Sequence, residues 1–190
     1  MLSERTSRPP NPETARVFFA LWPPEEIARQ LGGIAAEFAK QAGGRPTRRE
    51  TIHLTLAFLG DIAVESLPEL QRVASELRFA AFDLKLDRFG LWKHNRLLWA
   101  GCGSPQLIDL ANVLQKRLLE AGFSVADAKR PFAPHLTLVR KVARLETALP
   151  VAEPLTWRCD SFALVRSQLS PAGSAYRVLA EFPPTETFKA

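Results

Sequence analysis

The tetrapeptide His-Leu-Thr-Leu occurs twice in this chain of 190 residues, at 53–56 and at 135–138. The two copies use two of only three histidines, so chance is a poor explanation for a histidine at the head of each. On a β-strand successive side chains alternate between faces, so each histidine shares a face with its threonine, and the two leucines point the other way. The repeat therefore predicts two strands, each with a polar side and a core side.

Composition restricts the class of protein without fixing a function. A hydrophobic fraction of 46% is ordinary for a globular fold, and 190 residues suit one domain or two small lobes around a continuous core. The formal charge of +5 and the pI near 9.6 weakly favour polyanionic partners. Cys102 and Cys159 lack metal-site spacing, and they predict reduced thiols in a cytoplasmic protein rather than a disulfide framework.

The N-terminal segment differs from the rest of the chain. Residues 1–15 carry charges and prolines but no apolar run, so we expect a disordered tail there and neither a signal peptide nor a membrane anchor. We expect the folded part to be one bilobal domain spanning 16–190.

Hydrophobic periodicity predicts alternating strands and helices. Apolar residues recur at helical spacing in three segments, and short aromatic, β-branched or alternating runs predict strands between them. The predicted helices run through 27–38, 67–77 and 107–118, and the predicted strands cover 17–22, 51–59, 82–87, 97–102, a segment from 135 onward, 157–165 and 176–182. We expect Gly60-Asp61 to end the second strand, and we expect 82–87 and 97–102 to pair as a hairpin.

The order of the elements repeats along the chain. Each motif strand comes after comparable lengths of α and β structure, and no long linker or charge block separates the halves. We therefore predict an α+β fold of two related lobes in a pseudo-two-fold, duplicated arrangement.

Two His-x-Thr strands side by side would supply the groups that a phosphodiester with a neighbouring hydroxyl needs. One imidazole would deprotonate the attacking oxygen, the other would protonate the leaving oxygen, and Thr55 and Thr137 would donate to the phosphoryl oxygens. A histidine pKa of about 6.5 allows one ring to be neutral and the other charged around pH 7. We expect no metal, because threonine is a poor ligand and neither tetrapeptide contains a carboxylate. The alternative is a pair of inert, hydrogen-bonded strand histidines.

Longer stretches around both motifs resemble the paired signatures of the two-histidine (2H) phosphoesterase superfamily. Residues 44–60 read GRPTRRETIHLTLAFLG, and residues 130–141 read RPFAPHLTLVRK. The similarity is greatest to the bacterial RNA 2′,3′-cyclic phosphodiesterase branch, historically called 2′-5′ RNA ligase. It extends to RVFFALWPP at 16–24, LLWAG at 97–101 and LSPAGSAY at 169–176.

The resemblance implies two mainly antiparallel sheets that line a central cleft, with helices packed outside. It implies hydrolysis of RNA or nucleoside 2′,3′-cyclic phosphates to 2′-phosphates, with His53 as proton donor to the leaving 3′ oxygen and His135 as the acceptor that activates water. Some members also join RNA ends reversibly through 2′-5′ linkages. We expect a cytoplasmic monomer that needs no cofactor and acts on RNA or nucleotide 2′,3′-cyclic phosphate ends. The alternative is a module that binds a nucleotide or an RNA end in the same cleft without turnover.

Positive charges bracket the second motif. Five basic residues and no acidic residue occur between Asp127 and Glu146. They are Lys129, Arg130, Arg140, Lys141 and Arg144. Regular alternation would turn Arg140 away from the histidine face unless the strand bends, whereas the resemblance places an arginine here near the substrate. We take Arg140 and Arg130 as candidate substrate-binding residues.

Five further aromatic or histidine positions could lie in the site or outside it. Phe18 and Phe19 face opposite ways, so one can stack on a base while the other enters the core; we take Phe19 as the candidate without settling the choice. The same alternation sends Phe58 to the core. Tyr176 either lines the cleft or packs inside, and His94 is expected at the surface.

Overall fold

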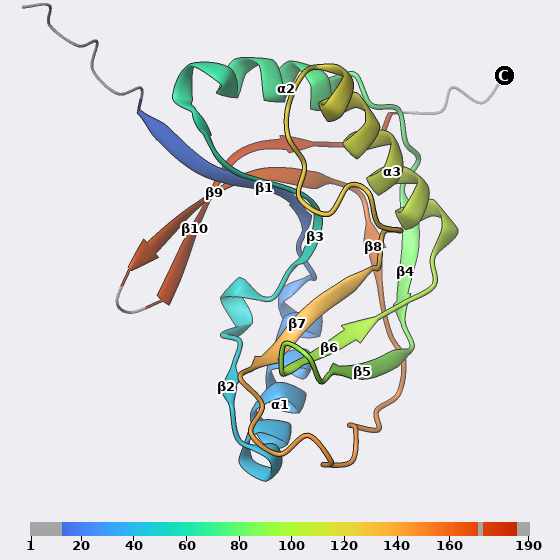
Figure 1. The fold of residues 1–190 in the computed structure, drawn as a ribbon. Helices are drawn as coiled ribbons and strands as arrows, with labels where there is room; N and C mark the ends of the chain where they lie inside the picture. Colours follow the sequence, from blue (N-terminus) through green and yellow to red (C-terminus); the bar gives the residue numbers. More distant parts are fainter. Residues whose placement is uncertain (1–12, 171–172, 186–190) are drawn as a thin grey trace, which may run out of the picture.

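The fold is seen in a computed structural model, which describes residues 13–170 and 173–185. The described chain begins with alternating strands and helices and ends with four successive strands (Figure 1). They are β1 (Thr14–Leu21), α1 (Glu25–Ala42), β2 (Arg45–Pro46), β3 (Leu54–Ala63), α2 (Leu67–Ser75), β4 (Phe82–Leu86), β5 (Arg88–Trp92), β6 (Leu97–Gly101), α3 (Pro105–Glu120), β7 (His135–Arg140), β8 (Leu155–Cys159), β9 (Phe162–Ser170) and β10 (Gly173–Phe182).

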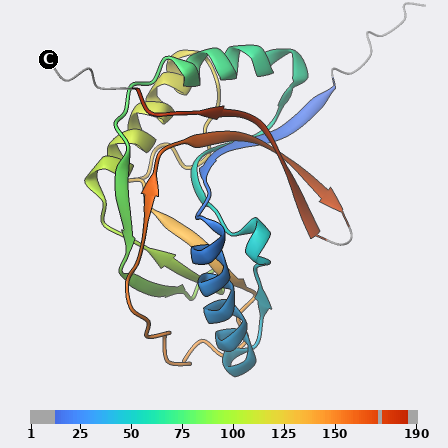
Figure 2. The same ribbon diagram turned by 180° about the vertical axis from the view of Figure 1, so that it is seen from behind.

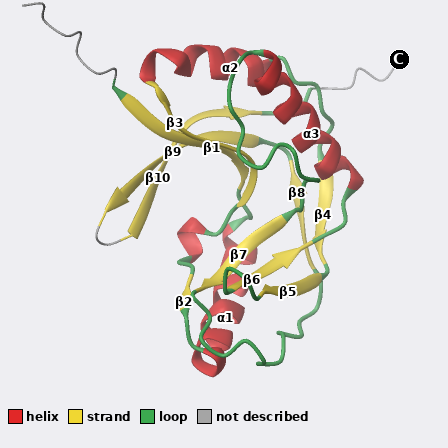
Figure 3. Cartoon of the chain, viewed as in Figure 1, coloured by secondary structure: helices red, strands yellow, loops and turns green. Residues whose placement is uncertain are grey.

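Eight strands form one antiparallel sheet in the order β10-β9-β1-β3-β7-β6-β5, with β2 beside β7 (Figures 1 and 3). The motif strands β3 and β7 share one pair of opposed residues, Leu54 and Leu136. The sheet therefore divides there into a first lobe (β10, β9, β1 and β3) and a second lobe (β7, β6, β5 and β2). The predicted α+β, two-lobed architecture is confirmed, and the two expected sheets are halves of a continuous one. Strands β4 and β8 form a separate two-stranded sheet.

Helices α1 and α3 are each followed in the chain by a motif strand, but each packs against the other motif strand. Helix α1 precedes β3 but lies against β7, and α3 precedes β7 but lies against β3 (Figures 1 and 2). The buried stripe of α1 includes Leu31 and Phe38, and that of α3 includes Leu107 and Leu114. Burying these stripes on opposite lobes joins the two halves into one hydrophobic core.

The first strand starts earlier than the sequence indicated. Thr14 and Ala15, which we had assigned to the tail, belong to β1 and lie opposite Ala63 and Ile62. The segment 1–12 lies outside the described residues. Within the described residues, no helix is both long and apolar enough to span a membrane.

The end of β3 also differs from the prediction. The strand continues to Ala63 because Gly60 adopts a φ of 76°, a left-handed conformation that glycine tolerates. Leu59 forms an extra residue at this point, since Val17 lies opposite Gly60 while Phe18 lies opposite Phe58. The strand bends and continues instead of stopping.

The prediction that 82–87 and 97–102 pair as a hairpin is wrong. Strand β4 pairs with β8, where Phe82 lies opposite Cys159, and β6 pairs with β5 instead. The segment 157–165 is likewise two strands, β8 and β9, rather than one. Alternation shows which face of a strand is buried, but it carries no information about the partner strand.

Candidate active site

A cleft of about 850 Å³ lies over the junction of the two motif strands and is lined by residues of both lobes. His53, Thr55, His135 and Thr137 all line it. The structure therefore brings the four predicted catalytic side chains to one cavity, as the alternation of the two tetrapeptides requires.

Both histidine rings are held in the same way. Nδ1 of His53 lies 2.7 Å from the carbonyl oxygen of Thr51, and Nδ1 of His135 lies 2.8 Å from that of Ala133. Because a carbonyl oxygen only accepts hydrogen bonds, Nδ1 must donate in each ring. In the neutral rings Nε2 is then the basic nitrogen, so each ring can accept or return a proton there.

The first motif strand contains a β-bulge directly after its threonine. In the ladder with β1, Ala20 lies opposite Thr55 and Phe19 opposite Ala57, which leaves Leu56 as the extra residue. The Leu56 carbonyl accepts a hydrogen bond of 2.7 Å from Nε2 of Gln115 on α3. A bulge inverts the alternation beyond it.

As a result of this bulge, the prediction that Phe58 enters the core is wrong. Its side chain lines the cleft and is 38% exposed. Its face of the strand is the one that His53 and Thr55 also occupy. Phe58 therefore adds an accessible aromatic surface to the site.

The second motif strand carries the equivalent bulge. Trp99 lies opposite Thr137 and Leu98 opposite Val139, so Leu138 is the extra residue. Its carbonyl accepts a hydrogen bond of 2.8 Å from the backbone N–H of Thr47. The bulge turns Arg140 into the cleft. The strand thus bends, and Arg140 lies on the same face as His135, which regular alternation alone did not predict.

The choice of Phe19 as a stacking residue is wrong. Phe19 is 0% exposed and packs against the rings of Phe162 and Phe182, with both centroid distances 6.1 Å. Phe18 takes the histidine side, but it is only 3% exposed and its ring supports His53 at 4.9 Å. Neither side chain offers a free stacking face, because β1 is a central strand with both faces covered.

Aromatic rings contact both histidines, and the sequence analysis gave no role in the site to two of them, Trp22 and Trp92. The ring of Trp22 stacks on that of His53 with a centroid distance of 5.1 Å. The ring of Tyr176 makes a T-shaped contact with the same imidazole at a centroid distance of 5.2 Å. Trp92 contacts His135 at 4.6 Å. Tyr176 lines the cleft, which resolves its open role, and the exposed His94 lies at the rim of the same cleft. Trp22 follows Phe18 by four residues, and an even spacing on an extended chain places both side chains on one face. This spacing could have identified Trp22 as a neighbour of the site.

Positive charge dominates the cleft. Five basic residues line it with a single carboxylate, Asp127. The five are Arg45, Arg48, Arg130, Arg140 and Lys141. Arg45 lies directly opposite Arg140 in the ladder between β2 and β7, where two like charges repel unless an anion offsets them. Arg130 lies at the rim, with its side chain 80% exposed and 3.4 Å from Asp127. The arrangement favours a bound anion.

The same surroundings lower the pKa of both histidines. Burial is the largest cause for His53 and brings its pKa to about 4, with further lowering by Arg140 and His135; the hydrogen bond to Thr51 opposes this. Burial and then Arg140 lower the pKa of His135, against the hydrogen bond to Ala133. Both rings are therefore mainly neutral at pH 7. A bound phosphate would offset the Arg140 charge and favour protonation of one ring.

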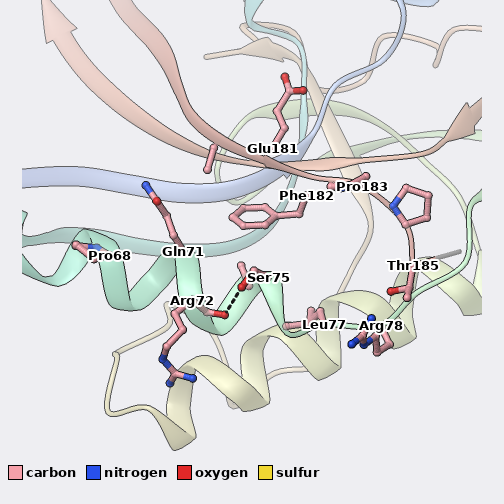
Figure 4. Close-up of a pocket in the computed structure, with 13 residues that line it drawn as sticks. Pro68, Gln71, Arg72, Ser75, Leu77, Arg78, Glu181, Phe182, Pro183 and Thr185 are labelled. Atoms are coloured by element: carbon pink, nitrogen blue, oxygen red, sulfur yellow. Dashed lines mark hydrogen bonds between the residues drawn. The ribbon is translucent and has the colours of Figure 1, made fainter.

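A second concavity of about 650 Å³ lies between α2 and the end of β10 (Figure 4). It contains no histidine, and its Arg72 is already paired with Glu69 at 2.7 Å. This groove lacks an acid–base pair, so the cleft between the lobes is the candidate active site.

The chain matches the model of one protein family along most of its length. Residues 21–99 and 101–176 match the family described as LigT like Phosphoesterase, and each matched segment contains one motif histidine. The chain belongs to this family. The resemblance inferred from the motifs is thereby confirmed.

Individual relatives agree with this assignment to the LigT-like phosphoesterases. The RNA 2′,3′-cyclic phosphodiesterase of Escherichia coli K12 is 33% identical over 176 residues, covering 92% of this chain and 99% of the relative. The protein of the same name from Thermus thermophilus is 32% identical, covering 88% of this chain and 89% of the relative. The crystal structure of E. coli LigT complexed with 3′-AMP has a TM-score of 0.84 and 33% identity, covering 92% of this chain and 100% of that one.

Proposed function

We propose that this chain hydrolyses 2′,3′-cyclic phosphates at the ends of RNA or on nucleosides, without a metal, and leaves a 2′-phosphomonoester. The observation that carries the proposal is the pair of histidines held alike in one basic cleft, with both Nδ1 atoms donating to backbone carbonyls. The names of the relatives support the cyclic phosphate as substrate. Metal independence follows from the side chains, which supply an acid, a base and phosphoryl donors by themselves.

In this mechanism the two histidines handle one proton each. Neutral His135 accepts a proton at Nε2 from water as the water oxygen bonds to phosphorus. Protonated His53 donates from Nε2 to the 3′ oxygen as its bond to phosphorus breaks. The resemblance to the superfamily assigns the two roles, which the symmetry of the motifs leaves open. The low pKa of free His53, about 4, requires the anionic substrate to raise it before the donor can be charged.

The remaining cleft residues hold the phosphate. Thr55 and Thr137 share the faces of the two histidines, so their hydroxyls can donate to the non-bridging oxygens. The Arg140 guanidinium offsets the phosphate charge, and Arg130 attracts the substrate from the rim. Phe58 offers its ring to a base. The alternative of a non-catalytic binding module would use the same contacts.

The test is product analysis on a 2′,3′-cyclic nucleotide in excess chelator. We expect a 2′-phosphate as the product and losses of about 10³-fold in kcat for His53→Ala and His135→Ala. Lys85→Ala, at an exposed position on β4, serves as the matched control. Absence of ring opening, or ring opening unchanged in both histidine variants, would defeat the proposal. Tight binding of the cyclic nucleotide with no product would favour the binding module.

We further propose that 16–190, together with Thr14 and Ala15, acts as one catalytic domain, because both lobes contribute a histidine to the cleft. A cytoplasmic location is supported by Cys102 and Cys159, which are free and buried thiols. A monomeric state stays a prediction, which measurement of the molar mass in solution would test.

A further inference from the structure

Three positive charges lie together in the cleft, where β2 runs beside the end of β7 (Figure 1). Arg45 on β2, Arg140 on β7 and Lys141 directly after β7 all line the cavity. Within residues 13–170 and 173–185, none of these three side chains takes part in an ion pair or a hydrogen bond. They form a cation cluster that lacks an anion.

A pair of glycines places Arg45 in this cluster. Helix α1 ends at Ala42, and the chain then turns through Gly43 and Gly44, which have φ values of 69° and 113°. A Cβ atom at Gly44 would lie 2.9 Å from the carbonyl oxygen of Arg140, so glycine is needed for β2 to approach β7 this closely. Arg45 then lies directly opposite Arg140, and such cross-strand neighbours have Cβ atoms about 5 Å apart.

The end of β7 turns a third cation into the cleft. Consecutive residues of a regular strand point to opposite faces, so Lys141 should leave the cleft where Arg140 enters it. Lys141 instead has a φ of 56°, in the left-handed region that residues other than glycine rarely adopt. The backbone turns at this residue, and both side chains line the cavity. A rare backbone conformation that gathers like charges indicates a function for the cluster.

A single cyclic phosphate does not offset this charge. A 2′,3′-cyclic phosphate is a diester with one negative charge, and Arg140, which lowers the pKa of both catalytic histidines, is the cation that faces it. Asp127 is the one carboxylate among the described residues that line the cleft, and it is paired with Arg130 at 3.4 Å. Arg45 and Lys141 therefore call for a second anion beside the first.

We propose that Arg45 and Lys141 bind the phosphodiester that joins the terminal nucleotide of an RNA to the nucleotide before it. The inference rests on the proposed function and specifies its substrate, because a nucleoside cyclic phosphate lacks that group. In RNA one ribose separates the 2′,3′-cyclic phosphate from the phosphodiester on its 5′ oxygen. The adjacent positions of Arg45 and Arg140 suit two anions that are neighbours along a chain. The cluster thereby selects RNA ends over free nucleotides through charge-assisted hydrogen bonds.

Three substrates with the same terminal base test this phosphate site. They are a nucleoside 2′,3′-cyclic phosphate, a dinucleotide with a 2′,3′-cyclic phosphate end, and the same dinucleotide with an uncharged methylphosphonate in place of its internal phosphodiester. The quantity measured is kcat/KM for each dinucleotide divided by kcat/KM for the nucleoside. Damage to the histidines or to Arg140 affects all three substrates and cancels in this ratio.

We expect the parent enzyme to prefer the charged dinucleotide about 10-fold, because it alone offers an internal anion to the cluster. The methylphosphonate dinucleotide should be preferred less than about 3-fold. Arg45→Met and Lys141→Met should each lower the preference for the charged dinucleotide about 3-fold, and the double variant should remove it. Arg45→Lys keeps the charge and should retain most of the preference. Arg144→Met, at an exposed position outside the cleft, is the matched control.

The dependence on salt gives a second readout. One further phosphate contact should steepen the slope of log kcat/KM against log salt concentration by about 0.7 for the charged dinucleotide, relative to the nucleoside. The two slopes should become equal in the double variant of Arg45 and Lys141.

Any of three results would overturn the second phosphate site. They are equal kcat/KM for the charged dinucleotide and the nucleoside, a methylphosphonate dinucleotide that is as good a substrate as the charged one, and a preference that neither Arg45→Met nor Lys141→Met changes. Failure to open the cyclic phosphate of any of the three substrates would instead reject the proposed function, so the two failures are distinguishable.

Discussion

The two motif strands have the same backbone and different chemistry. Both run from a histidine through a threonine to a bulged leucine, and both have the same order of buried and exposed positions after the first leucine. Five residues after the histidine, however, the first strand presents Phe58 and the second presents Arg140. The backbone is duplicated, and the side chain that follows the bulge differs in chemistry between the two lobes.

The surroundings of the two histidines also differ, with more aromatic contacts at His53 and a charged strand end near His135. His53 lies against three aromatic rings, whereas His135 contacts Trp92 and lies on the strand that ends in Arg140. The first lobe thus gives an apolar setting and the second lobe gives charge. The imidazole of His53 is therefore harder to protonate than that of His135.

The largest expected effect is on the pH dependence of the free energy of unfolding, which tests this difference between the histidines. The pKa of folded His53, about 4, lies below its unfolded value of about 6.5, so the unfolded chain binds more protons between these values. The contribution of His53 to the free energy of unfolding is therefore fully present above pH 6.5. It declines by about 3 kcal/mol as the pH falls to 4. We expect His53→Asn to remove that decline in denaturant titrations at pH 7 and pH 4. His135→Asn should remove less of it, and equal effects of the two variants would contradict the comparison.

The second test removes the charge of the second lobe. Arg140→Met should lower kcat/KM about 100-fold, because a donor aimed at the phosphoryl oxygens is lost. It should also abolish inhibition by inorganic phosphate. Arg144→Met, at an exposed position away from the cleft, removes the same charge and is the matched control. A comparable loss in both variants would mean that only net charge matters.

The third test removes the aromatic surface of the first lobe. Phe58→Leu should raise KM for a cyclic nucleotide about 10-fold, because one base-stacking face is lost. Inhibition by inorganic phosphate should persist, in contrast to Arg140→Met. Phe58→Tyr retains a flat ring and should keep KM near the parent value. Loss of phosphate inhibition in Phe58→Leu would show that the lobes do not divide these tasks.

The smallest expected effect concerns the first bulge. Gln115→Met leaves the Leu56 carbonyl without its donor, which should cost about 1 kcal/mol of unfolding free energy. As Phe58 loses its fixed direction, KM should rise about 3-fold, as steady-state kinetics can measure. Lys116→Met, on the exposed face of the same helix, is the control. An unchanged KM would show that β1 alone maintains the bulge.

Several features were predictable because they depend on local periodicity. The repeated tetrapeptide predicted the shared face of each histidine and threonine, and the apolar spacing predicted three helices. The family resemblance added the cleft and the position of Arg140.

Other features depend on register, which the local pattern does not encode. The bulge at Leu56 reversed the expected direction of Phe58, and its counterpart at Leu138 decided that of Arg140. The side taken by Phe19 depends on β1 lying between two other strands. The contact between Trp92 and His135 joins residues that are far apart in the chain, so no short window could contain it.

The reciprocal packing of α1 and α3 makes the two halves of the chain depend on each other. If the chain were divided between its two family segments, α1 would keep its apolar stripe and lose the strand that covers it, and α3 would do the same. Neither half would therefore be stable on its own, because each would expose the apolar stripe of its own helix to water.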